Sequence, residues 1–86
     1  MTRRLMDRVT AEAGTHDRAR TTLAALSPRE REVAVEIARG CSNAEIAAGL
    51  GMTVATVKAH VSHVLTKLEL GNRTQIALLV HDADLI

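Results

Sequence analysis

The stretch from Thr53 to Lys67 carries short polar side chains at spacings that suit contact with a nucleic-acid duplex. An α-helix advances about 100° per residue, so a helix here would gather its small and polar side chains on one face. These side chains are Ala55, Ala59, Ser62 and Thr66, with Lys58 and His63 at the borders of the face. Small residues allow close approach to a groove, Ser62 can hydrogen-bond base edges, Lys58 can reach guanine or phosphate, and Ala59 can touch a thymine methyl. The pattern predicts a surface that reads bases in a major groove.

Two expected helix starts supply further donors of the kind that bind phosphate. Ser42 and Asn43 open one helix, and Thr53 and Thr56 lie at the start of the next. Backbone N–H groups at a helix start attract anions, here at Asn43 and Val54. Capping of the helix is an equal alternative for Ser42 and Thr53, because a cap already uses the side-chain oxygen. Of the two threonines, Thr56 is therefore the preferred phosphate donor.

Other chemistries lack the residues that they need. His60 and His63 lie three positions apart on one helix, but the sequence positions no third ligand, so no metal is expected. No paired carboxylates, activated nucleophile or phosphate-cradling glycine loop is recognisable, which predicts a protein that is not an enzyme and uses no cofactor or small-molecule ligand. Cys41 is the only cysteine and is interpreted as a small apolar filler.

Length and composition restrict the partner further. A chain of 86 residues has room for one small domain. It contains no Phe, Tyr or Trp on which unpaired bases could stack, so single-stranded nucleic acid is a poor candidate. With 11 Lys plus Arg against 10 Asp plus Glu, affinity for a duplex must come from the placement of charge. No stretch approaches the ~18 apolar residues of a membrane span, and no signal peptide is evident, which predicts a cytoplasmic protein without a membrane partner.

Repeated start signals place these side chains on a series of four short helices. Ser27-Pro28-Arg29-Glu30 combines a capping serine, a proline at the first helical position and a capping-box glutamate. Similar start signals lie at Ser42, Thr53 and Asn72, and glycines suited to helix ends lie at Gly40 and Gly51. The expected helices cover residues 28–39, 43–50, 54–69 and a fourth stretch that begins near 73.

The apolar residues of these helices recur at helical spacing and predict an all-α, four-helix bundle-like domain. The third helix carries the longest stripe, which would pack onto the first two helices. Its members are Val57, Val61, Val64, Leu65 and Leu68. The short connection from Gly51 to Thr53 is typical of a helix-turn-helix. We assign residues 26–86 to this domain and residues 1–25 to a linker or N-terminal extension that is partly helical.

The segment LSPREREVAVEIARGCSNAEIAAGLGMTVATVKAHVSHVLTKLELGNR resembles the LuxR-type, or NarL/FixJ-type, helix-turn-helix domain of bacterial transcription regulators. The matching words are SPRE, SNAEIA, TVKAH followed by KL, and NR, and the likeness covers about Leu26 to Ile86. Three positions depart from the family pattern: Thr53 replaces the usual serine, Glu69 replaces the usual glycine, and Gly49 weakens the end of the second helix. The N-terminal TRRLMDR also resembles the region that follows the receiver domain in two-component response regulators.

The resemblance implies four helices, the third in the major groove and the fourth pairing two copies on DNA. It also implies that Lys67 and Arg73 contact the sugar-phosphate backbone, although either could instead merely solvate a helix end. The implied function is sequence-specific binding of double-stranded DNA in transcription regulation, as the effector part of a response regulator. RNA polymerase is a further implied partner.

The fourth helix is apolar nearly all round, which a helix that buries a single side does not require. Ile76, Leu79 and Val80 would face the core of the domain. Leu78 points elsewhere and is the candidate for a homodimer contact, with a simple exposed leucine as the equal alternative. The sequence therefore predicts a homodimer on DNA that is held in part by Leu78.

Two other functions fit parts of the same pattern. A sigma-factor region 4 shares the fold and would bind RNA polymerase at a promoter. A helical protein-interaction module would use the polar face without binding DNA, since a polar helix face usually just contacts water.

Overall fold

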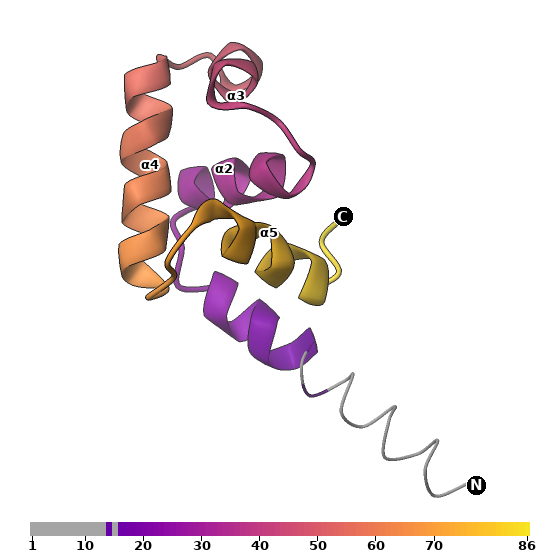
Figure 1. The fold of residues 1–86 in the computed structure, drawn as a ribbon. Helices are drawn as coiled ribbons and strands as arrows, with labels where there is room; N and C mark the ends of the chain where they lie inside the picture. Colours follow the sequence, from indigo (N-terminus) through magenta and orange to yellow (C-terminus); the bar gives the residue numbers. More distant parts are fainter. Residues whose placement is uncertain (1–13, 15) are drawn as a thin grey trace, which may run out of the picture.

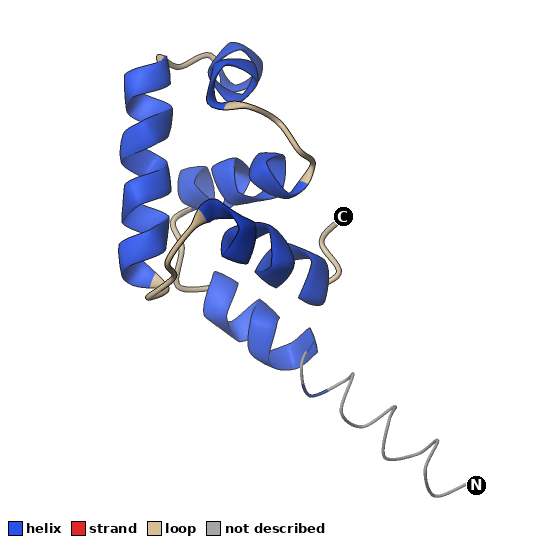
Figure 2. Ribbon diagram, in the orientation of Figure 1, coloured by secondary structure: helices blue, strands red, loops and turns tan. Residues whose placement is uncertain are grey.

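The computed structural model describes residue 14 and residues 16–86, and every regular element in this part of the chain is an α-helix. The helices α2 to α5 follow one another along the chain, and residues 16–23, here called the N-terminal helical segment, precede them (Figures 1 and 2). The bounds are α2 Pro28–Ala38, α3 Asn43–Leu50, α4 Val54–Lys67 and α5 Arg73–Asp82. The all-α fold expected from the sequence is confirmed.

The helices begin where the sequence patterns place them. Ser27 and Ser42 each accept a hydrogen bond from the backbone N–H three residues on, and the glutamate there binds back to the backbone of the serine. Thr53 and Asn72 cap α4 and α5 in the same way through their side-chain oxygens. These caps satisfy N–H groups that a helix start would otherwise leave without an acceptor. The predicted starts of all four helices are therefore confirmed.

Two predicted helix ends are wrong, and the smaller error is at α2, which ends at Ala38 and not at Arg39. The third helix was expected to continue to Glu69, but α4 ends at Lys67. Glu69 has a φ of 55°, which lies in the left-handed region that ends a helix and favours glycine. The backbone conformation here explains why glycine is usual at this position in the family that the sequence resembles, and this chain holds the same conformation with a glutamate.

The hydrophobic core is aliphatic and is built by α2, α4 and α5, with Ile46 and Ala47 of α3 also buried in it. Its fully buried members include Val33 of α2, Val57 and Val64 of α4, and Ile76 and Val80 of α5. The remaining residues of the predicted α4 stripe, Val61, Leu65 and Leu68, are partly buried against this cluster. Figure 1 shows the resulting arrangement, with α4 along one side of the molecule and α3 at its N-terminal end. One face of α4 is thus left uncovered.

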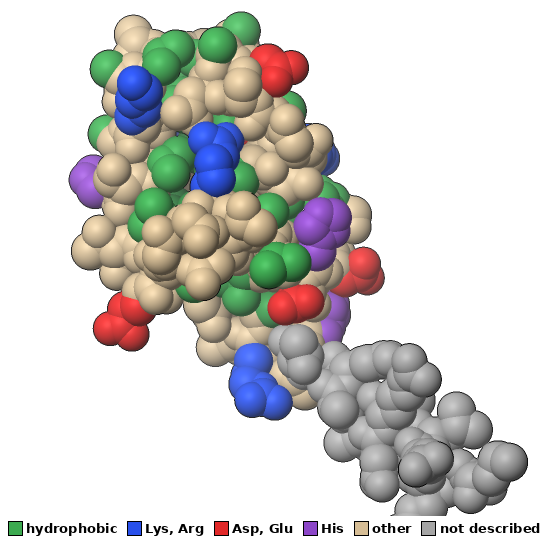
Figure 3. Space-filling view, in the orientation of Figure 1, with side chains coloured by type: hydrophobic (Ala, Val, Ile, Leu, Met, Phe, Trp, Pro, Cys, Tyr) green, Lys and Arg blue, Asp and Glu red, His purple; other side chains and the backbone are tan. Residues whose placement is uncertain are grey.

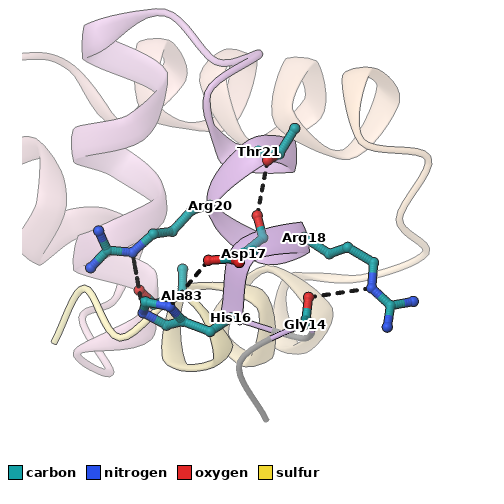
Figure 4. Close-up of polar contacts among 7 residues, drawn as sticks. All are labelled: Gly14, His16, Asp17, Arg18, Arg20, Thr21 and Ala83. Atoms are coloured by element: carbon teal, nitrogen blue, oxygen red, sulfur yellow. Dashed lines mark hydrogen bonds and ion pairs between the residues drawn. The ribbon is translucent and has the colours of Figure 1, made fainter. Parts of the chain in front are cut away.

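The N-terminal helical segment belongs to the same core, which therefore begins upstream of residue 26. Ala19 and Leu23 are buried in the hydrophobic cluster. Arg20 donates from Nε to the carbonyl of Ala83, just beyond α5, at 3.0 Å, and also lies 3.2 Å from Nε2 of His16 (Figure 4). Residues 16–23 are helical and lie within residues 1–25, which we predict to be a partly helical linker or N-terminal extension. The TRRLMDR stretch lies outside the described residues.

Candidate nucleic-acid interface

The outward face of α4 is the largest functional surface that the sequence analysis singled out. Every residue predicted for this face is exposed: Ala55, Ala59, Ser62 and Thr66, together with Lys58 and His63 at its borders. Val57 and Val64 on the opposite side are fully buried, so the helix cannot rotate without exposing apolar surface. The core therefore fixes which side chains α4 presents. His60, on the same helix, is half-buried.

The N-terminus of α4 combines several groups that can bind an anion. Oγ1 of Thr53 accepts from the backbone N–H of Thr56 at 3.1 Å and lies 2.9 Å from Oγ1 of Thr56. Because each hydroxyl has one proton and the pair uses only one in their mutual bond, one hydroxyl proton remains for an outside acceptor. The first turn of α4 contains no acidic residue, and Lys58 follows on the exposed surface.

The N-terminus of α3 is less open. Glu45 accepts from the backbone N–H of Ser42 at 2.8 Å, and its own N–H donates to Oγ of Ser42 at 3.1 Å. The hydrogen bond from the Ser42 backbone lowers the pKa of the Glu45 carboxyl, so this helix start already holds a negative charge. Ser42 is therefore engaged in capping, which was one of its two expected roles, and α4 has the freer helix start.

Lys67 forms an ion pair with Glu30, for which the sequence predicts only a role in the cap of α2. Its Nζ lies 2.7 Å from Oε1 of Glu30. The same carboxylate oxygen accepts from the backbone N–H of Ser27 at 2.9 Å. The hydrogen bond from Lys67, followed by that from Ser27, lowers the pKa of Glu30 to about 2. Glu30 thus joins the start of α2 to the end of α4.

The two side chains of this ion pair differ in their exposure to solvent. The Glu30 side chain is 6% exposed, whereas that of Lys67 is 45% exposed. An ammonium has three donors, so Lys67 keeps N–H groups that face outward. No local sequence signal announced the pair, since the two residues are far apart in the chain and the capping box already accounted for the glutamate.

Arg73 also makes contacts within the protein. Its NH1 donates to Oδ1 of Asn43 at 2.7 Å, and its NH2 donates to the carbonyl of Cys41 at 3.0 Å. Arg73 and Asn43, which are both predicted to contact DNA, are therefore hydrogen-bonded to each other. Arg73 is also half-buried. The structure brings Arg73 to the start of α3, a proximity that the sequence spacing did not predict.

The positive charges on the face shown in Figure 3 are dispersed. In the space-filling view the Lys and Arg side chains stand apart from one another and form no continuous basic patch on that face (Figure 3). Across residues 14 and 16–86, Lys58 forms no ion pair with an acidic side chain. Its charge is thus fully available to a polyanion, in contrast to that of Lys67.

Within the described residues, neither Cys41 nor the histidines are placed for thiol chemistry or metal binding. Cys41 is half-buried and packs against the core, as expected for a small filler. Burial, followed by a hydrogen bond to Glu36, raises the pKa of its thiol, which disfavours the reactive thiolate. The described residues contain no group of three or more side chains placed to hold a metal ion, and none of their helices is long and apolar enough to cross a membrane.

The exposed surface of α5 is centred on Leu78. This side chain is 58% exposed, whereas Ile76 and Val80 are fully buried and Leu79 is partly buried. The predicted orientation of the fourth helix is confirmed by this burial pattern. A leucine exposed to this degree is free to meet a second copy of the chain.

Comparison with known proteins agrees with this geometry. The family model described as GerE, "Bacterial regulatory proteins, luxR family", matches residues 24–80. The "Uncharacterized transcriptional regulatory protein YhcZ" of Bacillus subtilis is 51% identical over 63 residues. The "Response regulator protein VraR" of Staphylococcus aureus is 46% identical over 61 residues. These alignments cover 73% and 71% of this chain, which spans 29% of the length of either relative.

A solved structure has the same fold. A crystal structure of full-length FixJ from B. japonicum superposes with a TM-score of 0.78 at 24% sequence identity. The match covers 91% of this chain and 38% of the FixJ chain. The family match bears out the resemblance to the luxR-type family, and the solved structure bears out the fold.

Proposed function

We propose that α4 enters the major groove of a DNA duplex, because this chain belongs to the luxR family of bacterial regulatory proteins, whose helix-turn-helix domains bind DNA in transcription regulation. The observation that carries the proposal is the exposed face of α4, which consists of small and short polar side chains. The opposite side of the helix is fixed in the core by the fully buried Val57 and Val64. On the exposed face Ser62 and Lys58 contact base edges, Ala59 contacts a thymine methyl, and His63 faces the groove border.

Phosphate contacts flank the helix in this proposal. The Thr53 and Thr56 hydroxyl pair donates its remaining proton to one phosphate, and the free N–H groups at the start of α4 support the same contact. Lys67 offers its outward N–H groups to a second phosphate while it stays paired with Glu30. Ser42 and Asn43, at the start of α3, contact the same DNA strand.

Two copies of the chain bind one operator in the proposal, with Leu78 of each α5 at their contact. An exposed leucine in a two-fold interface meets its own counterpart or a neighbour of that counterpart. RNA polymerase is a further proposed partner of the assembled pair on a promoter. The proposed cellular setting is the cytoplasm, where the chain acts as the effector part of a response regulator.

Selection of bound sequences from a random duplex pool tests the proposed function. The expected result is enrichment of a common half-site by the wild-type chain and an altered base preference within that half-site for Ser62→Ala or Lys58→Ala. Arg18→Ala is the matched control, because it removes a cation from the N-terminal helical segment, remote from α4 in the chain. Failure of the wild-type chain to retain any duplex would overturn the proposal and favour a protein-interaction module.

A further inference from the structure

Arg73 bridges α5 to the connection that leads into α3. The guanidinium donates to the side chain of Asn43, the first residue of α3, and to the backbone carbonyl of Cys41. Each bond uses a different terminal nitrogen, so the two contacts fix the orientation of the planar group. Arg73 is itself the first residue of α5. One side chain therefore connects the starts of two helices.

The surface between this connection and α5 is partly hollow. A hollow of about 300 Å³ lies between this connection and α5, lined by Ile37, Gly40, Cys41, Arg73, Thr74 and Ala77. Gly40 turns the chain there with a φ of 85°. The two hydrogen bonds of Arg73 act at this hollow together with the burial of Ile46 in the core and the backbone hydrogen bond from Cys41 to Glu36, and all of them restrain where α3 begins.

We infer that Arg73 is a positioning residue for DNA binding, which holds the start of α3 against the duplex and does not itself contact phosphate. The inference rests on the proposed function, because it assigns a role within the same interface. Its basis is that NH1 and NH2 each donate one hydrogen bond to an acceptor inside the protein and that Arg73 is half-buried, so contacts within the protein set the orientation of the guanidinium. It replaces the expectation, drawn from family resemblance, of a direct backbone contact by Arg73.

The substitution Arg73→Lys distinguishes a positioning role of Arg73 from a direct contact of Arg73 with phosphate. Lysine keeps the positive charge but lacks the planar fork that reaches two acceptors at once. Binding of the full chain to a fluorescein-labelled, mixed-sequence duplex would be measured by anisotropy across a series of salt concentrations. Wild type, Arg73→Lys, Arg73→Ala and the control Arg39→Lys would be compared. Arg39 is a suitable control because it forms an exposed pair with Glu36.

Positioning predicts that Arg73→Lys and Arg73→Ala both weaken binding roughly tenfold, as expected from loss of a bidentate charged contact. The slope of log affinity against log salt stays at the wild-type value, because no phosphate contact is removed. Arg39→Lys leaves affinity and slope unchanged. Wild-type affinity in Arg73→Lys, with a slope reduced by about one in Arg73→Ala, would overturn the inference and assign Arg73 to phosphate.

Amide hydrogen exchange in the absence of DNA keeps the inference testable if a variant binds poorly for another reason. Positioning predicts faster exchange in Arg73→Lys and Asn43→Ala at the hydrogen-bonded N–H groups of Ser42, Glu45 and Ile46, with exchange at the core of α4 unchanged. Unchanged exchange at these three groups in both variants would also overturn it. A wild-type chain that binds no duplex at any salt concentration would instead reject the proposed function, so the two failures are distinguishable.

Discussion

The ammonium of Lys67 lies 2.7 Å from Oε1 of Glu30, and this pair fastens the last turn of α4 to the first turn of α2. The glutamate is buried while the lysine remains partly exposed. One end of the proposed reading helix is therefore anchored to the domain by a charged contact as well as by apolar packing. The pair links the pH dependence of stability to the placement of the DNA-binding surface.

Acid should destabilise the domain through Glu30. The pKa of this carboxyl falls from 4.5 to about 2 on folding, so its ionised form favours the folded state. Its contribution is complete above about pH 4.5 and is lost as the pH falls toward 2. Glu30→Gln should cost about 2 kcal/mol near neutral pH and flatten this acid dependence. Urea unfolding at a series of pH values measures both effects.

The control for that measurement is Glu32→Gln, which removes an exposed carboxylate paired with Arg29 on the same helix. Exposed pairs contribute little to stability, so the acid dependence of this variant should follow that of the wild type. An acid dependence in Glu30→Gln as steep as in the wild type would show that the pair with Lys67 does not stabilise the fold.

Replacement of Glu69 by glycine should stabilise the domain. Glu69 holds a left-handed backbone with a φ of 55°, which a residue with a Cβ adopts at a cost and glycine adopts freely. We expect Glu69→Gly to raise the free energy of unfolding by about 0.5 to 1 kcal/mol. Glu32→Gly, inside α2, should lower it by about 1 kcal/mol. Thermal unfolding compares them, and a destabilised Glu69→Gly would contradict the prediction.

Two glycines at the end of α3 should respond oppositely to alanine. Gly49 lies within the helix, and a Cβ built there meets no atom within 4 Å. Gly49→Ala should therefore stabilise the domain by about 0.5 to 1 kcal/mol through helix propensity. Gly51 has equal space but a φ of 66°, so Gly51→Ala should destabilise it. Equal shifts of the unfolding midpoint in both variants would contradict this account.

Substitutions on and beside α4 should divide into two classes. Changes at Ser62 or Lys58 should alter base preference within a half-site by about 1 to 3 kcal/mol, because these residues face the groove in the proposed complex. Lys67→Ala should weaken cognate and scrambled duplexes alike and reduce the salt slope by about one. Anisotropy on both duplexes measures the division, and circular dichroism must first show that each variant remains helical. If all three changes lowered the affinity for the cognate and the scrambled duplex equally, α4 would not be the helix that recognises the base sequence.

Leu78→Asp should reduce cooperative binding to an operator with two half-sites. The side chain is 58% exposed in the single chain, so its replacement should leave the fold intact while placing a charge at the proposed contact. Binding to a single half-site should be unchanged. Gel-shift titrations on one-site and two-site duplexes test this, and undiminished cooperativity in the variant would remove Leu78 from the dimer interface.

The helix starts and the exposed face of α4 followed from the sequence alone. Capping patterns such as Ser27 with Glu30 are local, because donor and acceptor lie within one turn of each other. The period of the apolar residues in α4 likewise fixed which side meets the core and which side stays exposed. The family resemblance then supplied a function for that exposed side, and the comparisons bear out the family.

The partners of the charged side chains were decided only by tertiary structure. Lys67 and Glu30 are brought together by the packing of α4 on α2, and Arg73 meets Asn43 because α5 folds back to the start of α3. Such contacts depend on the relative placement of whole helices, which no local periodicity encodes. The burial of Leu23 was also decided by tertiary structure, because it depends on how the N-terminal helical segment packs against the rest of the domain.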